Sequence, residues 1–155
     1  MKFFSLMAVS KFLITTGMTT NTDYVTKSEI LDFSEEKNFQ CFDWVDHPID
    51  IFRATGGLVG HIAVICGGRY AGNRHDECYK VTQNKAVLLG KMTTTRFGAA
   101  SVVLNNDILW ITGGNNGSYL SSTDFLHLNG TVTEGSSGCR RSKMTNPTLS
   151  DLLSF

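Results

Sequence analysis

An apolar run that ends in two glycines lies at Ile108-Leu109-Trp110-Ile111-Thr112-Gly113-Gly114. The same pattern occurs at Ile62-Ala63-Val64-Ile65-Cys66-Gly67-Gly68 and, with Thr16 in place of the leading glycine, at Phe12-Leu13-Ile14-Thr15-Thr16-Gly17. β-Branched and aromatic residues favour strands, and glycine permits a sharp turn where a strand ends. The last glycines of the three runs lie 51 and 46 residues apart. This near-constant spacing predicts a repeated unit in an all-β protein.

An acidic residue opens a second apolar run after each glycine-terminated run. These residues are Glu29, Glu77 and Asp124, which lie 48 and 47 residues apart. A residue that recurs with the repeat is expected to satisfy backbone donors or an arginine inside every unit. The sequence therefore predicts a structural role for these three carboxylates rather than a catalytic one.

Two segments rich in small residues precede the later glycine runs, and each begins with an arginine. They are Arg53 to Leu58 and Arg96 to Leu104, with the two arginines 43 residues apart. This recurrence predicts a structural role for both arginines. Small side chains suit a strand near a crowded central axis. Asn105-Asn106-Asp107 and Asn115-Asn116-Gly117 predict tight hairpins with left-handed or Asx-type backbone. The outermost strand of each unit is expected at 40–45, 85–89 and 130–134.

The ordered set of arginine, small-residue strand, diglycine and acid resembles the kelch motif. The best match is Arg96 through Leu128, where Arg-Phe-Gly-Ala-Ala-Ser, Leu-Trp-Ile-Thr-Gly-Gly and Ser-Thr-Asp-Phe-Leu follow the family's order. The resemblance implies an incomplete kelch-type β-propeller, an open arc of two to three four-stranded antiparallel blades. The repeats are expected at about 12–48, 49–92 and 93–135. Propellers close with typically 4 to 8 blades, so uncovered blade edges offer a route to self-association.

Composition limits the classes of partner. The 155 residues hold fourteen basic and fourteen acidic side chains, so no long-range field attracts nucleic acid. No segment approaches the ~20 apolar residues that cross a bilayer. Residues 1–11 read as a signal peptide or a first strand, and 136–155 as an irregular tail. We expect secretion rather than a cytoplasmic location, in which case two sequons, with Asn116 as the better acceptor and Asn129 as the second, would carry glycans.

Four cysteines leave two alternatives open. Cys66 and Cys78 flank a hairpin loop, so they form either a disulfide in an oxidising compartment or a reduced pair in the core. A metal site from Cys66, His75 and Cys78 matches no common zinc spacing and lacks a fourth ligand. We therefore expect no metal and no cofactor.

Rigid strands that present variable loops suit a binding protein. The residues expected to contact a partner are Arg69, Tyr70, Arg74 and Tyr119, since arginine and tyrosine offer large contact area with hydrogen-bonding ends. No nucleophile elbow, zinc-protease helix or phosphate-binding loop occurs. The sequence therefore predicts a non-catalytic protein-interaction scaffold. The alternatives are a truncated kelch paralogue or gene fragment with no independent activity, and a propeller-type enzyme that oxidises a substrate or processes glycans.

Overall fold

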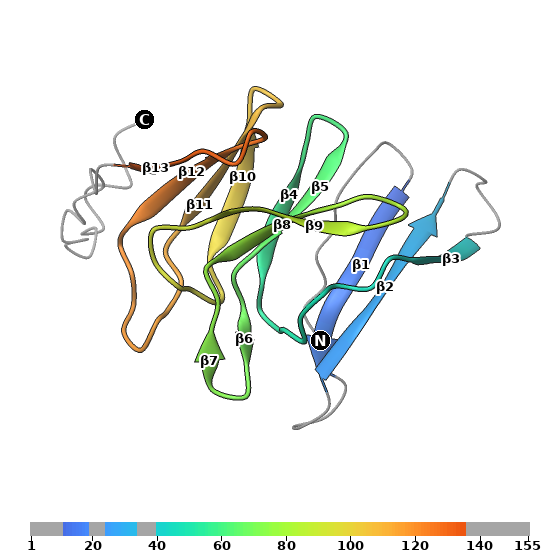
Figure 1. Cartoon of the computed structure of the whole chain (residues 1–155), viewed down its shortest axis with the longest axis horizontal. Coiled ribbons are helices and arrows are strands. Elements are labelled where there is room, and N and C mark those ends of the chain that lie inside the picture. The colour runs from blue at the N-terminus through green and yellow to red at the C-terminus, as the bar shows by residue number, and fades with distance from the viewer. Residues whose placement is uncertain (1–10, 19–23, 34–39, 136–155) are drawn as a thin grey trace, which may run out of the picture.

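Three antiparallel sheets stand side by side in the computed structural model, which describes residues 11–18, 24–33 and 40–135 (Figure 1). The first sheet has the order β1 (Lys11–Met18), β2 (Tyr24–Asp32), β3 (Gln40–Trp44). The second has the order β4 (Thr55–Val59), β5 (Ile62–Cys66), β8 (Glu77–Val81), β9 (Ala86–Lys91). The third has the order β10 (Ala100–Leu104), β11 (Ile108–Thr112), β12 (Thr123–His127), β13 (Val132–Gly135). A hairpin of β6 (Arg69–Tyr70) and β7 (Asn73–Arg74) extends from the second sheet.

The expected fold class is confirmed: the chain is all-β over its described residues, and its sheets form an open propeller-like arc. The glycine-terminated strands β5 and β11 lie inside separate sheets, each paired with neighbours on both sides. The outer strands β3, β9 and β13 lie close to the expected positions. The proposed signal peptide or first strand at 1–11 falls almost wholly outside the described residues, as does the tail at 136–155.

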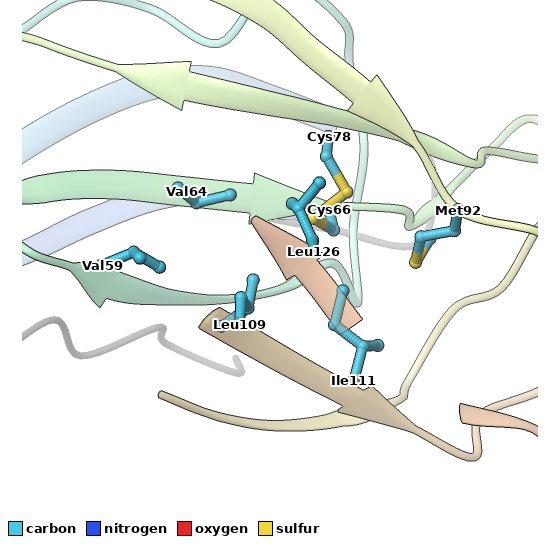
Figure 2. Close-up of a cluster of buried hydrophobic side chains, with 8 residues drawn as sticks. All are labelled: Val59, Val64, Cys66, Cys78, Met92, Leu109, Ile111 and Leu126. Carbon is cyan, nitrogen blue, oxygen red and sulfur yellow. A yellow bond between two sulfur atoms is a disulfide. The ribbon is translucent and has the colours of Figure 1, made fainter. Parts of the chain in front are cut away.

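Two hydrophobic cores join the three sheets. Between the first and second sheets lie Leu13, Ile51, Ala54, Ala63, Ile65 and Val81. Between the second and third lie Val59, Val64, Cys66, Cys78, Met92, Leu109, Ile111 and Leu126 (Figure 2). Successive side chains of a strand point to opposite faces, so β5 sends Val64 to one core and Ile65 to the other. The second sheet is therefore covered on both faces, which stabilises the arc without a closed ring.

The small residues of β4 allow the second and third sheets to approach closely. Strand β4 packs against β10 and β11. A side chain on Gly57 would place its Cβ only 2.7 Å from Val103 Cγ2 and 2.8 Å from Leu109 Cδ1. Ser101 Oγ accepts a hydrogen bond from Thr55 Oγ1 at 2.8 Å and donates to Gly56 O at 2.7 Å. Close contact between inner strands is the physical reason for the small-residue segments.

Left-handed turns follow the glycine-terminated strands and tie each sheet to the next. Gly68 has φ of 106°, and its amide donates to Arg96 O at 2.9 Å. Gly17 N donates to Ile51 O at 3.2 Å, which is the same link one sheet earlier. Thr16 adopts φ of 54°, close to the 64° of Gly67, so it takes the backbone conformation of the glycine it replaces. Asn105 and Asn106 also have positive φ, as expected.

Candidate functional site

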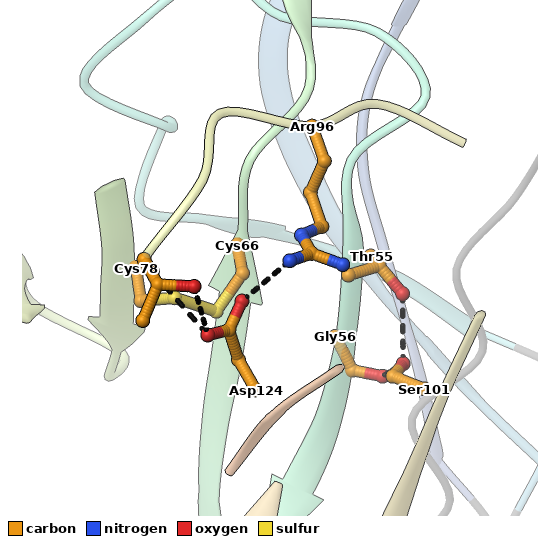
Figure 3. The surroundings of a disulfide bond; sticks show 8 residues. Thr55, Gly56, Cys66, Cys78, Arg96, Ser101 and Asp124 are labelled. Carbon is orange, nitrogen blue, oxygen red and sulfur yellow. Dashed lines mark hydrogen bonds and ion pairs between the residues drawn. A yellow bond between two sulfur atoms is a disulfide. The ribbon is translucent and has the colours of Figure 1, made fainter. Parts of the chain in front are cut away.

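Arg96, in the segment before β10, and Asp124, on β12, form a fully buried ion pair. Arg96 Nη2 donates to Asp124 Oδ2 at 2.7 Å (Figure 3). Thr93 Oγ1 donates to Asp124 Oδ1 at 2.6 Å. Arg96 Nη1 also donates to Gly113 O and Ser122 O, both at 3.0 Å. Both charged side chains are 0% exposed. This arginine joins the diglycine turn to strand β12, and the structural role expected for Arg96 and Asp124 agrees with this geometry.

Arg53 does not repeat the role of Arg96, because the two arginines do not occupy corresponding positions, and the predicted alignment of the two is wrong. Strands β4 and β10 begin at Thr55 and Ala100, which lie 45 residues apart, and the bridged residues Phe52 and Phe97 before them have the same offset. Ile51 therefore corresponds to Arg96, and Arg53 corresponds to Gly98. Both Arg53 and Gly98 have positive φ, 57° and 64° respectively. The chemical pattern alone aligned the arginines two residues out of register.

Glu29 and Glu77 do not have the surroundings that their repeat position predicted. Glu29 is exposed on β2, opposite Asp43. Glu77 accepts from Lys91 Nζ at 3.1 Å and lies 3.3 Å from His75 Nδ1. Burial alone raises the pKa of Glu77, but bonds from its own backbone, Lys91 and His75 outweigh burial and lower the pKa from 4.5 to about 2. Only Asp124, of the three acids, binds an arginine inside its sheet among the described residues.

The loops that follow β5 and β11 meet at one end of the sheets. We define the loop-end surface as Arg53, Arg69, Arg74, Phe97, Asn115 and Tyr119. The Arg69 guanidinium lies over the Phe97 ring, 5.6 Å from its centroid. The Arg74 guanidinium lies beside Gly117, with Nη2 3.3 Å from the position a Cβ would take there. Tyr119 is 93% exposed. Three of the four predicted contact residues, Arg69, Arg74 and Tyr119, therefore lie near each other.

The fourth predicted contact residue, Tyr70, lies on β6 next to Arg69 and is 37% exposed. It pairs across the hairpin with Asn73. It remains part of the binding prediction but does not line the hollow described next.

A hollow of about 340 Å³ opens at the loop-end surface. Its lining residues are Arg53, Phe97, Gly98, Gly114, Asn115 and Tyr119. Gly114 turns with φ of 90°, and a Cβ there would lie 2.9 Å from Phe97 O and 3.1 Å from Ala99 N. The diglycine turn thus brings Asn115 against Phe97, whose backbones exchange two hydrogen bonds of 3.0 and 3.1 Å. The diglycine turn and the backbone pairing of Phe97 with Asn115 therefore form walls of this hollow.

The arginines at this end form no ion pair within the described part of the chain. Among the residues that the structure describes, Arg53, Arg69 and Arg74 form no ion pair with a carboxylate, whereas Arg96 and Lys91 do. Asp76 and Glu77, which follow β7 in the chain, both bind Lys91. The loop-end surface therefore presents cationic and aromatic groups together.

Sequence reasoning missed Arg53, Phe97 and Asn115 as members of this surface. The signal for Arg53 was present: an arginine stands where the next repeat has Gly98. It becomes visible only when the repeats are aligned on their inner strands rather than on their arginines.

Cys66 and Cys78 form a disulfide across β5 and β8, where they are directly opposed in the register. Both are fully buried in the second core, and Cys41 is exposed with a free thiol. Of the three residues considered as metal ligands from the sequence, Cys66 and Cys78 are joined through their sulfurs in the disulfide, and His75 contacts Glu77. Over 11–18, 24–33 and 40–135, no cluster of three or more His, Cys, Asp or Glu side chains is placed to hold a metal ion.

The two sequons differ in exposure. Asn129 is exposed in the turn between β12 and β13, and its Oδ1 accepts from Thr131 N at 2.9 Å. Asn116 is half-buried in the loop after β11. Accessibility therefore favours Asn129, the reverse of the ranking expected from the sequence. In the same described part of the chain, no helix is long and apolar enough to cross a bilayer.

Comparison with known proteins supports the fold. No protein-family model matches the chain, and no curated protein matches it. A solved structure titled "Structure of YjhT" superimposes with a TM-score of 0.72 at 16% sequence identity. The match covers 84% of this chain and 44% of that one, so the chain spans less than half the length of this structural neighbour. At this identity, the likeness concerns the arrangement of the sheets alone.

Proposed function

We propose that this chain is a non-catalytic, kelch-type scaffold that binds a protein partner through its loop-end surface. The observation that carries the proposal is the convergence of two loops beside one hollow: the β6–β7 hairpin brings Arg69 and Arg74, and the loop after β11 brings the exposed Tyr119. Arginine and tyrosine are enriched among the residues that dominate binding energy in protein interfaces. Arginines that lack a carboxylate partner among the described residues favour a partner with acidic residues at the contact.

The rigid base beneath the loops also supports binding. The buried Arg96–Asp124 pair, the two diglycine turns and the disulfide fix the ends of the strands from which these loops start. A surface held in its binding geometry loses less conformational entropy on association. Asp124, whose recurrence with the repeat predicted a structural role, is fully buried and bound by Arg96 and Thr93, so it supports the frame of the fold.

Selection of displayed random peptides on the purified chain tests the proposal. Enriched peptides are expected to be acidic and to lose at least tenfold in affinity with Arg69→Ala/Arg74→Ala or with Tyr119→Ala, because truncation of a central contact costs about 2 kcal/mol or more. Lys85→Ala is the matched control, since Lys85 is an exposed cation in the turn at the far end of β8. Failure to enrich any peptide, or equal binding by all variants, would overturn the proposal.

Secretion forms part of the same proposal. A disulfide between Cys66 and Cys78 persists in oxidising compartments and is rare in the reducing cytosol. Expression in a secretory host is expected to give a glycan on Asn129 or Asn116 and a cleaved N-terminus near Ser10. Intact Met1 without any glycan would contradict secretion and leave the binding proposal to its own test.

A further inference from the structure

Arg53 holds a backbone conformation that arginine rarely adopts. Its φ of 57° lies in the left-handed region, where a side chain is strained and where the corresponding residue of the third sheet is glycine. The surrounding backbone enforces this conformation: Gly98 N donates to Arg53 O at 2.7 Å, and the adjacent Phe52 exchanges hydrogen bonds of 3.0 and 3.1 Å with Arg69. Strained non-glycine residues of this kind cluster at functional sites.

The side chain of Arg53 is available to a ligand. It is exposed and lines the hollow, and its guanidinium lies 5.7 Å from the Phe52 ring centroid. No hydrogen bond or ion pair joins the guanidinium to another of the described residues. Arginine offers a planar fork of donors that matches a carboxylate with two parallel hydrogen bonds. Its strained backbone thus supports a charged group that contacts the Phe52 ring and whose hydrogen-bond donors have no acceptor among the described residues.

The rest of the hollow adds donors and aromatic walls. Asn115 Oδ1 accepts from Gly117 N at 2.7 Å, so the hydrogens of its Nδ2 amide remain as donors. Phe97 and Tyr119 supply rings, while the Arg69 guanidinium lies over Phe97 and adds positive charge nearby. A volume of about 340 Å³ exceeds one carboxylate and accommodates its adjoining carbon chain and backbone.

We infer that this hollow is a carboxylate subsite, with Arg53 as its principal ligand-binding residue and the side chain of a partner's Asp or Glu as its occupant. The inference rests on the proposed protein-binding function and names the chemical group that this surface recognises. A free organic acid has the same recognition chemistry, so the test separates the two sources.

The test is an NMR titration of the full chain with three small probes. N-acetylglutamate N-methylamide should shift the amide signals of Gly98, Gly114 and Asn115 saturably, whereas its glutamine isostere should not. Glutarate reports on free organic acids and is expected to bind no more tightly than the peptide-like acid. Equal shifts with the glutamine probe would overturn the carboxylate assignment, and tenfold tighter binding of glutarate would overturn the assignment to a partner's side chain.

Arg53→Gly separates binding from folding, because glycine accepts the left-handed backbone that Arg53 must be forced into. This variant should lose at least tenfold in affinity for the glutamate probe while its melting temperature stays unchanged or rises. Arg53→Lys keeps the charge but loses the planar fork, and it should bind severalfold more weakly. Lys85→Gln, with the same loss of charge far from the hollow, should bind normally. Unchanged affinity in Arg53→Gly would refute the inference.

The selected peptides distinguish this inference from the proposed function. If Arg69→Ala/Arg74→Ala abolishes peptide binding and Arg53→Gly does not, the loop-end surface binds its partner and the carboxylate subsite is wrong. If none of these changes alters peptide binding, the proposed function itself fails.

Discussion

Replacement of Asp124 by leucine should destabilise the fold severely, because it leaves the Arg96 guanidinium charged and buried without a counterion. Asp124 accepts from Arg96 Nη2 at 2.7 Å, from Thr93 Oγ1 at 2.6 Å and from Thr93 N at 3.3 Å. Removal of one partner of a buried ion pair typically costs about 3–5 kcal/mol. Thr93 is exposed, so its donors can bind water instead and add little to this cost.

The double substitution Arg96→Met/Asp124→Leu should recover most of that loss. Apolar residues of similar volume often replace a buried pair without net cost, and the Arg96 Nε–H has no hydrogen-bond partner among the residues that the structure describes. The second sheet already has an apolar residue at this position, since Ile51 is buried where the third sheet has Arg96. The changes in unfolding free energy of Arg96→Met, Asp124→Leu and the double variant should therefore give a coupling energy between the two side chains of at least about 3 kcal/mol.

Urea unfolding followed by tryptophan fluorescence measures these quantities, with Trp110 on β11 as a local probe. Arg96→Met alone should also destabilise strongly, since Asp124 would then be the unpaired charge. A cost below about 1 kcal/mol for Asp124→Leu, or a double variant as unstable as the sum of the singles, would refute the view that the pair is dry and tightly coupled.

Two further predictions concern the disulfide and one surface ion pair. Cys66→Ala/Cys78→Ala should lower the free energy of unfolding by about 3 kcal/mol, because the crosslink closes a loop with a sequence separation of 12. Equal stability of this variant and the oxidised protein in urea would contradict this prediction. Glu77, whose folded pKa of about 2 lies below its ordinary value of 4.5, should contribute stability that is complete above pH 4.5 and is lost as pH falls toward 2. Acid titration of the melting temperature should therefore show a shallower decline in Glu77→Gln, and parallel curves would exclude this contribution.

The sequence by itself determined the elements that depend on local chemistry. Apolar runs that end in glycine became β5 and β11, Asn105 and Asn106 took left-handed backbone, and Cys66 met Cys78 across a predicted hairpin. These features depend on strand periodicity and on the few residues that tolerate positive φ, so a short stretch of sequence is enough to predict them. The repeat spacing also indicated several stacked sheets, because one such sheet cannot cover its own apolar faces.

Only the tertiary structure decided which side chains meet. The offset of 45 residues between β4 and β10 depends on how two inner strands pack, and it assigns Arg53 to a glycine position and Ile51 to the position of Arg96. Likewise, Arg69 meets Phe97 because Gly68 bonds to the backbone of Arg96 across the boundary between sheets. Contacts between loops far apart in sequence depend on the geometry of that packing, which no local pattern specifies.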